Sequence, residues 1–129
     1  MTKEDFQKQL KKKYPVLYKN LGNKKSMSGG FVLPIAFGIE CGEGWYNLID
    51  YVSSKLESLY QDIEVVQVKE KFGGIRIYTN KDTLEAGKII EFAEKESENT
   101  CEMCGKKGQM MNYSGWYKTR CHKCKDKKW

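Results

Sequence analysis

Two Cys-x-x-Cys pairs near the carboxyl end of the chain constrain its structure more than any other feature of the sequence. Cys101 and Cys104 form the first pair, and Cys121 and Cys124 form the second pair after sixteen intervening residues. Two residues between ligands let one tight turn aim both thiolates at a single tetrahedral ion, and the spacing falls within the range of four-cysteine zinc sites. The sequence therefore predicts a zinc ribbon in which these four cysteines bind one Zn²⁺ ion.

A structural role is the expectation for this ion, because four thiolates leave no coordination position for water or substrate. A redox-active dithiol and an iron site are the alternatives to zinc. His122 lies inside the second pair and can replace one of its neighbours as a ligand, but two flanking cysteines at the usual spacing favour an exposed or supporting position for it. The metal is thus expected to hold the chain together without taking part in chemistry.

The length of 129 residues suits one hydrophobic core with a small appended module and is too short for two full-sized domains. Helical and hairpin patterns both occur before the cysteine pairs. We therefore expect an α+β fold, with a helix and β-hairpin core domain over residues 1–99 and the zinc ribbon over residues 100–129.

The amino-terminal third contains one clear helical pattern. Residues 1–14 predict a helix that Thr2 caps and Pro15 ends, with three apolar side chains on one face: Phe6, Leu10 and Tyr14. Residues 20–30 combine glycine, serine and lysine without a period and predict a loop. Residues 31–40 form an apolar run that contains Pro34, which favours an edge or terminal strand over a central one.

Three further elements are expected between residues 44 and 99. Residues 44–61 carry apolar side chains at helical intervals and predict a helix. Residues 64–79 hold two β-rich stretches around Gly73 and Gly74, which predicts a hairpin that turns at these glycines. Residues 82–99 predict a second helix with Asp82 as its N-cap.

The net charge of +6 is distributed unevenly. Residues 1–25 carry eight basic and two acidic side chains, and residues 105–129 carry eight basic and one acidic. The segment between them has seven basic and fourteen acidic groups. Basic ends attract nucleic acid or another polyanion, although they are also compatible with solvated surfaces or with docking on the acidic middle. No stretch has the apolar length of a membrane span or a signal peptide, so we expect a cytoplasmic protein without a membrane partner.

The segment before the 44–61 helix is the one compact candidate for catalysis. With a single histidine beside the predicted metal, no Ser-His-Asp or Cys-His arrangement is expected elsewhere. Glu40, Cys41 and Glu43 precede the helix start, where the backbone N–H groups of Gly42 and Gly44 can bind an anion. A plain turn into the helix explains the glycines equally well, and Cys41 suits a small buried residue.

Three stretches together carry a family resemblance: CGEGWYNLID at 41–50, VKEKFGGIRIY at 68–78, and the cysteine segment at 101–124 with its internal GW. They resemble a group of small uncharacterised proteins of bacteria and their phages. Members of that group often end the second cysteine pair with histidine, so Cys124 is a departure that changes the type of ligand and not the number. The resemblance implies a shared functional surface on these three stretches, but no particular activity.

Three classes of function remain open from the sequence. The first is a non-enzymatic binding protein, such as a phage accessory or anti-defence protein that binds a nucleotide-like anion or a host protein. The second is a nucleic-acid-binding zinc ribbon, and the third is an enzyme that uses Glu40 or Glu43. The candidate ligand-binding residues combine positive charge with indole faces, a combination suited to an anion with a planar base; they are Trp45, Lys71, Arg76, Trp116, Lys118 and Arg120.

Overall fold

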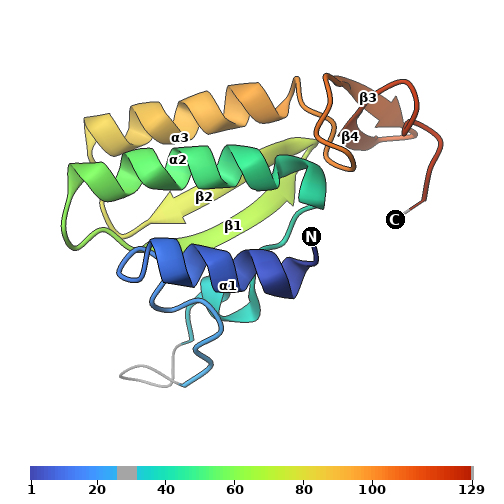
Figure 1. Ribbon diagram of the computed structural model, residues 1–129. Coiled ribbons are helices and arrows are strands. Elements are labelled where there is room, and N and C mark those ends of the chain that lie inside the picture. Colours follow the sequence, from blue (N-terminus) through green and yellow to red (C-terminus); the bar gives the residue numbers. More distant parts are fainter. Residues whose placement is uncertain (26–31, 129) are drawn as a thin grey trace.

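In the computed structural model, which describes residues 1–25 and 32–128, three α-helices and two antiparallel β-hairpins follow one another along the chain (Figure 1). The helices α2 and α3 cover the larger hairpin, α1 packs against α2, and the smaller hairpin lies at one end of this assembly (Figure 1). The predicted α+β class is confirmed, with the four carboxyl-terminal cysteines gathered as in a zinc module.

The first helix agrees with its sequence pattern. α1 spans Lys3–Lys13, and the side chain of Thr2 accepts a hydrogen bond from the Asp5 N–H at 3.1 Å. Phe6 and Leu10 are buried on one face of the helix. Turns continue to residue 22, so the predicted loop at 20–30 contains a turn at its start, while its residues 26–30 lie outside the described residues.

The strand expected at residues 31–40 does not form, and that prediction was wrong. Residue 31 lies outside the described residues, and Pro34–Phe37 form a short 3₁₀ helix with Pro34 at its start. Glu40 alone pairs with a strand: its N–H donates to the Val68 carbonyl at 3.0 Å and its carbonyl accepts from the Glu70 N–H at 3.0 Å. The proline fixes a compact turn, because its ring presets the helical φ and removes a ladder donor.

The two later helices lie side by side over the larger hairpin (Figure 1). A short 3₁₀ turn, Glu43–Trp45, leads into α2 at Tyr46–Leu59, and α3 spans Leu84–Ser97. The N-cap of α3 is Thr83, whose hydroxyl accepts from the Ala86 N–H at 3.3 Å, so the assignment of this cap to Asp82 was wrong. The cap is the residue whose oxygen reaches an unpaired N–H of the first helical turn, and only Thr83 makes that bond.

The larger hairpin consists of β1 at Val65–Lys71 and β2 at Gly74–Thr79, which confirms the hairpin predicted at 64–79. Lys71 pairs with Gly74, so the two turn residues are Phe72 and Gly73, with φ values of 53° and 83°. Gly74 belongs to the strand, and the prediction of a Gly73–Gly74 turn is corrected by one residue. The smaller hairpin pairs β3, Gln109–Tyr113, with β4, Trp116–Arg120.

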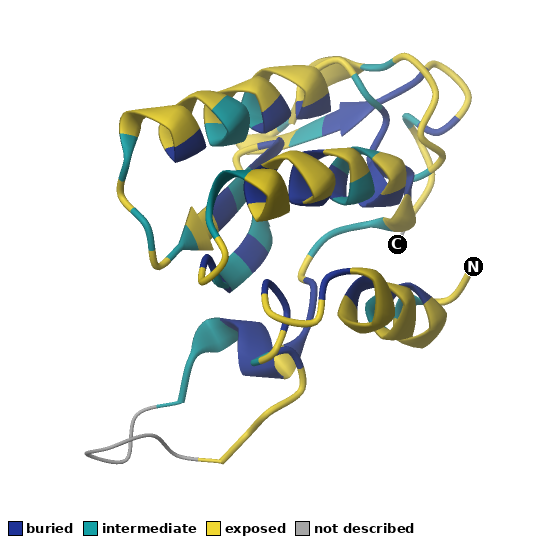
Figure 2. Ribbon diagram, turned by 60° about the vertical axis from the view of Figure 1, so that its left-hand side comes forward, coloured by how far each residue is buried: buried dark blue, intermediate teal, exposed yellow. Residues whose placement is uncertain are grey.

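The core lies where the helices and the larger hairpin meet, and their buried sides face inward (Figure 2). The ring of Phe6 in α1 stacks on Tyr46 in α2 with centroids 4.1 Å apart. The hydroxyls of Tyr18 and Ser53 form a buried hydrogen bond of 2.6 Å. Within residues 1–25 and 32–128, no helix combines the length and apolarity that crossing a membrane requires.

Candidate metal centre

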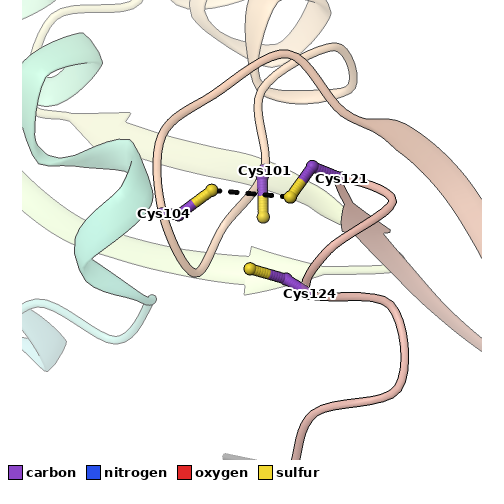
Figure 3. Close-up of side chains that lie close together, drawn as sticks. All are labelled: Cys101, Cys104, Cys121 and Cys124. Carbon is purple, nitrogen blue, oxygen red and sulfur yellow. Dashed lines mark hydrogen bonds between the residues drawn. The ribbon is translucent and has the colours of Figure 1, made fainter.

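The first cysteine pair lies on a tight turn that follows α3. The Cys101 N–H donates to the Lys106 carbonyl at 2.7 Å, and the Gly105 N–H donates to the Cys101 carbonyl at 2.9 Å. Gly105 has a φ of 82°, a left-handed conformation that glycine adopts without a steric penalty. These bonds fold the backbone back on itself and direct the side chains of Cys101 and Cys104 to the same side (Figure 3).

The second pair reaches the first through the smaller hairpin. The sixteen residues between the pairs contain β3 and β4, which turn at Ser114 and Gly115 with φ values of 56° and 95°. The strand β4 ends at Arg120, and a turn then closes with a 3.1 Å bond from the Cys124 N–H to the Cys121 carbonyl. The hairpin thus returns the chain so that the second pair faces the first.

The four sulfur atoms converge on one point (Figure 3). All four lie within 4.8 Å of one another, and the Cys104 and Cys121 Sγ atoms are 3.6 Å apart. Zn–S bonds of about 2.3 Å in a tetrahedron place sulfurs roughly 3.8 Å apart. The observed arrangement is close to that requirement, and the cluster can therefore hold a metal ion.

The electrostatics of the cluster favour a cation. Desolvation acts to raise the pKa of Cys121, but hydrogen bonds from the Cys124 backbone and the Cys104 thiol outweigh it and lower that pKa to about 6. Desolvation and the neighbouring Cys121 raise the pKa of Cys124 to about 12. Neighbouring thiolates repel one another, and a divalent cation at their centre relieves that repulsion and favours the deprotonated state of each ligand.

Two other side chains named from the sequence lie outside the cluster. His122 is exposed and does not belong to the four-residue group, as its position inside the second pair predicted. Cys41 is half-buried on the core domain, where desolvation raises the pKa of its thiol. Cys41 is therefore mostly protonated at neutral pH and poorly suited to act as a nucleophile.

The CGEGW stretch packs against the first cysteine pair. The Gly44 N–H donates to the Glu102 carbonyl at 2.7 Å, and the Gly42 N–H donates to the Glu102 carboxylate at 2.9 Å. Desolvation raises the pKa of this carboxyl. A Cβ atom on Gly44 would lie 2.1 Å from the Cys101 carbonyl oxygen, so only glycine fits there without displacement. The N–H groups of these glycines are thus used to dock the cysteine module.

Trp45 is fully buried, and its assignment to a ligand-binding surface was wrong. Its exposed fraction is 0%, and its indole N–H donates to the Thr100 carbonyl at 2.8 Å. The indole therefore anchors the core domain to the start of the cysteine module. Glu40 and Glu43 are exposed on this segment, where Glu40 makes its β-bridge through backbone atoms alone.

Three of the other predicted ligand-binding residues lie together. Trp116, Lys118 and Arg120 alternate along β4 and line a groove of about 470 Å³. Lys71 is exposed beside the tip of the larger hairpin. Arg76 lies on β2, where its guanidinium forms a 3.8 Å ion pair with Glu94 of α3, and it does not line the groove.

Sequence reasoning missed the remaining walls of this groove. Tyr113 and the segment after the second cysteine pair complete the lining, which also includes Lys125, Asp126, Lys127 and Lys128. The Tyr113 hydroxyl donates to the Lys125 carbonyl, and the Arg120 guanidinium donates to the carbonyls of Cys124 and Lys127. The available signal was the basic run that directly follows Cys124, a member of the cysteine cluster; it places the start of the run near the cluster but does not show that the run folds back along β4.

No protein-family model matches this chain, and it matches neither a curated protein nor a solved structure.

Proposed function

We propose that this protein is a zinc-stabilised binding protein whose groove on the cysteine module takes an anionic ligand with a planar aromatic group. The observation that carries the proposal is the groove itself, in which an exposed indole lies among basic side chains. Its volume of about 470 Å³ is within the range of small-molecule sites, roughly 300–1,000 Å³.

The charge of the groove supports an anionic ligand. Lys118, Lys125, Lys127, Lys128 and Arg120 line it, against the single carboxylate of Asp126. Lys118 forms an ion pair with Glu70 at 3.2 Å, whereas no ion pair within residues 1–25 and 32–128 involves the three lysines after Cys124. These ammonium groups are available to phosphate or carboxylate oxygens.

The aromatic side chains support a planar group on the ligand. Trp116 is 73% exposed, although its indole is large and apolar. Tyr113 is the second aromatic residue of the groove lining, and the Arg120 guanidinium carbon lies 5.7 Å from its ring centroid. An exposed indole is suited to stacking on the base of a nucleotide, and the lysines can bind the phosphate of the same nucleotide. The groove lining contains no histidine or cysteine, and the proposal assigns binding and no reaction to it.

The metal in this proposal is one Zn²⁺ ion per chain with a structural role. Four thiolates at tetrahedral spacing form the ligand set that structural zinc sites use. The ion would join the first cysteine pair, which docks on the core, to the second pair, from which the groove's lysines extend. Zinc binding would also hold Cys124, which precedes the lysine wall of the groove, close to Cys121, which follows β4.

The direct test is calorimetric titration of the zinc-loaded protein with adenosine monophosphate, adenosine and inorganic phosphate. The nucleotide should bind more tightly than either part alone. Trp116→Ala should weaken nucleotide binding by about 5- to 150-fold, because stacking on an aromatic side chain is worth roughly 1–3 kcal/mol. Tyr51→Ala is the matched control, since Tyr51 is a half-exposed aromatic on α2 outside the groove.

Two lysine variants distinguish the contribution of electrostatic attraction to ligand affinity from that of aromatic stacking. Lys125→Ala should weaken nucleotide and phosphate binding alike and reduce the salt dependence, whereas Lys88→Ala on α3 should leave both unchanged. Binding that Trp116→Ala and Lys125→Ala both leave intact would contradict the proposed site.

The bacterial or phage origin in this proposal rests on the sequence resemblance, and the cytoplasmic location rests on the sequence composition. We place the protein in the reducing cytoplasm of a bacterium, where free thiols persist as metal ligands. An accessory or anti-defence protein of a phage would use such a groove to sequester a nucleotide signal.

A further inference from the structure

A second aromatic surface lies on the other face of β4 from the groove. Side chains alternate along a strand, so Trp116 and Lys118 point to the groove face and Tyr117 and Thr119 point to the opposite face. The Thr119 hydroxyl donates to the Gly73 carbonyl at 2.6 Å in a buried bond. The face opposite the groove is therefore packed against the tip of the larger hairpin.

The tip of that hairpin holds an exposed aromatic residue in a strained conformation. Phe72 has a φ of 53°, in the left-handed region where Asn, Asp and Gly are the usual residues of a two-residue turn. Its side chain is 65% exposed, so packing within the chain does little to offset the strain. Strained residues of this kind are concentrated at functional sites.

The cysteine module holds this strained turn in place. The Gly73 N–H donates to the Glu70 carboxylate at 2.8 Å, and Glu70 also pairs with Lys118. A Cβ on Gly73 would lie 3.3 Å from the Met110 side chain and 3.3 Å from the Tyr117 backbone, which shows how closely β3 and β4 approach the turn. Phe72 therefore projects beside the two strands that form the groove.

The surface around the tip is both aromatic and basic. Phe72, Tyr117 and Met110 are all exposed, with exposed fractions of 65%, 42% and 40%. The Lys71 ammonium lies 5.5 Å from the Phe72 ring centroid, and in the described part of the chain it forms no ion pair. Two carboxylates lie near the tip: Glu70 pairs with Lys118 at 3.2 Å, and the Glu98 carboxylate would lie 3.5 Å from a Cβ on Gly74. Lys71 thus adds a positive charge that has no ion-pair partner in the described part of the chain.

We propose that the ligand of this protein is single-stranded nucleic acid, with one base on Trp116 in the groove and a neighbouring base on the aromatic surface of Phe72 and Tyr117. This inference rests on the proposed function, since it extends the same site. A free nucleotide would use the groove alone and leave the second aromatic surface without a role. A strand that passes over the edge of β4 uses both surfaces, because every base has a face for stacking and every linkage carries a phosphate for the lysines.

The observations favour nucleic acid over a protein partner because the aromatic side chains on both faces of β4 are accompanied by lysines that lack ion pairs in the described part of the chain. These are Lys71 at the tip and Lys125, Lys127 and Lys128 at the groove. The combination of stacking surfaces and positive charge matches the repeating chemistry of a single strand.

The test compares thymidine monophosphate with an oligothymidylate of about eight nucleotides, both titrated into the zinc-loaded protein at about 0.15 M ionic strength. The oligonucleotide should bind at least about tenfold more tightly than the mononucleotide. Phe72→Asn should remove most of that gain and leave mononucleotide binding unchanged. Trp116→Ala should weaken both ligands, and Tyr51→Ala should weaken neither.

Asparagine is chosen at position 72 because it tolerates the left-handed conformation, so the variant should melt no lower than wild type. Equal affinity for the two ligands would overturn the inference and leave the proposed function standing. A length-dependent gain that survives Phe72→Asn, as expected if the tip serves a protein partner, would also overturn it. Failure of both ligands to bind would instead refute the proposed function.

Discussion

Gly44 offers a sharp test of how the cysteine module is docked on the core. Its N–H donates to the Glu102 carbonyl at 2.7 Å, and an added Cβ would lie 2.1 Å from the Cys101 oxygen and 2.6 Å from the Glu102 carbonyl carbon. These are backbone atoms, so no change of rotamer relieves the overlap in a Gly44→Ala variant. The turn that carries Cys101 and Cys104 must move away from the core.

The cost of that movement has two parts. A weakened buried hydrogen bond costs about 0.5–1.5 kcal/mol, and overpacking against a rigid neighbour costs about 1–3 kcal/mol. The sum of about 3 kcal/mol corresponds to a fall in melting temperature of roughly 10 °C for a domain of this size. Because the displaced turn carries two of the four proposed zinc ligands, a chelator should also remove bound zinc faster.

The assay is thermal unfolding by circular dichroism, together with the rate of zinc transfer to a coloured chelator. Gly87→Ala is the matched control: Gly87 lies inside α3, and no atom would lie within 4 Å of its added Cβ. That variant should gain roughly 0.5–1 kcal/mol, since alanine favours a helix over glycine. A Gly44→Ala protein that melts within about 2 °C of wild type and keeps its metal equally well would refute the docking.

Three further predictions concern the same module and its surroundings. Cys121→Ser should increase amide hydrogen exchange across residues 100–128 while the helices of the core stay protected, and equal protection in both regions would contradict a metal-held module. Thr119→Val should lower the free energy of unfolding by about 1–3 kcal/mol, because it leaves the Gly73 carbonyl without its buried donor; urea titration measures this change, and a value near zero would argue against the contact. Cys41 should react with iodoacetamide far more slowly in the native protein than in urea at pH 8, because desolvation raises the pKa of its thiol and lowers the thiolate fraction; mass spectrometry of the labelled peptide gives both rates, and equal rates would contradict that environment.

Periodicity and spacing were sufficient to predict the three helices, the larger hairpin and the cysteine cluster, but not the short 3₁₀ helix at Pro34–Phe37 or the hairpin of β3 and β4. The interval from Phe6 to Leu10 indicates one buried helical face, and the two cysteine pairs are spaced so that a hairpin between them brings four sulfurs together. These signals are local, or depend on one short connection. Tertiary context therefore has little opportunity to override them.

Two of the errors arose where two neighbouring residues satisfied the same local rule. Asp82 and Thr83 are both good N-caps, and only the position of the first helical turn selects Thr83. In the FGG stretch, two successive pairs of residues can form the turn. Cross-strand pairing decides between them and places Phe72 in a conformation that its own propensity opposes.

Three residues of the groove lining had been named from the sequence, whereas the rest of the lining had not. Alternation along β4 would have grouped Trp116 with Lys118 and Arg120, but nothing local shows that the lysines after Cys124 fold back toward them. Trp45 shares helical intervals with Ile49 and Val52, and that pattern indicates a core position. It was assigned to ligand binding instead because it lies in one of the stretches that carry the family resemblance. The sequence allows an anion site or a plain turn at Gly44, whereas the approach of the Cys101 backbone, a long-range contact, explains why glycine is needed.

X-ray absorption at the zinc edge, on protein purified without a chelator, identifies the atoms that bind the proposed ion. We expect one zinc per chain, bound by four sulfur atoms at about 2.3 Å with no nitrogen or oxygen ligand. Such a spectrum would identify Cys101, Cys104, Cys121 and Cys124 as a closed structural site. Absence of zinc, or a coordination shell in which a nitrogen from His122 or an oxygen from water replaces one sulfur, would contradict it.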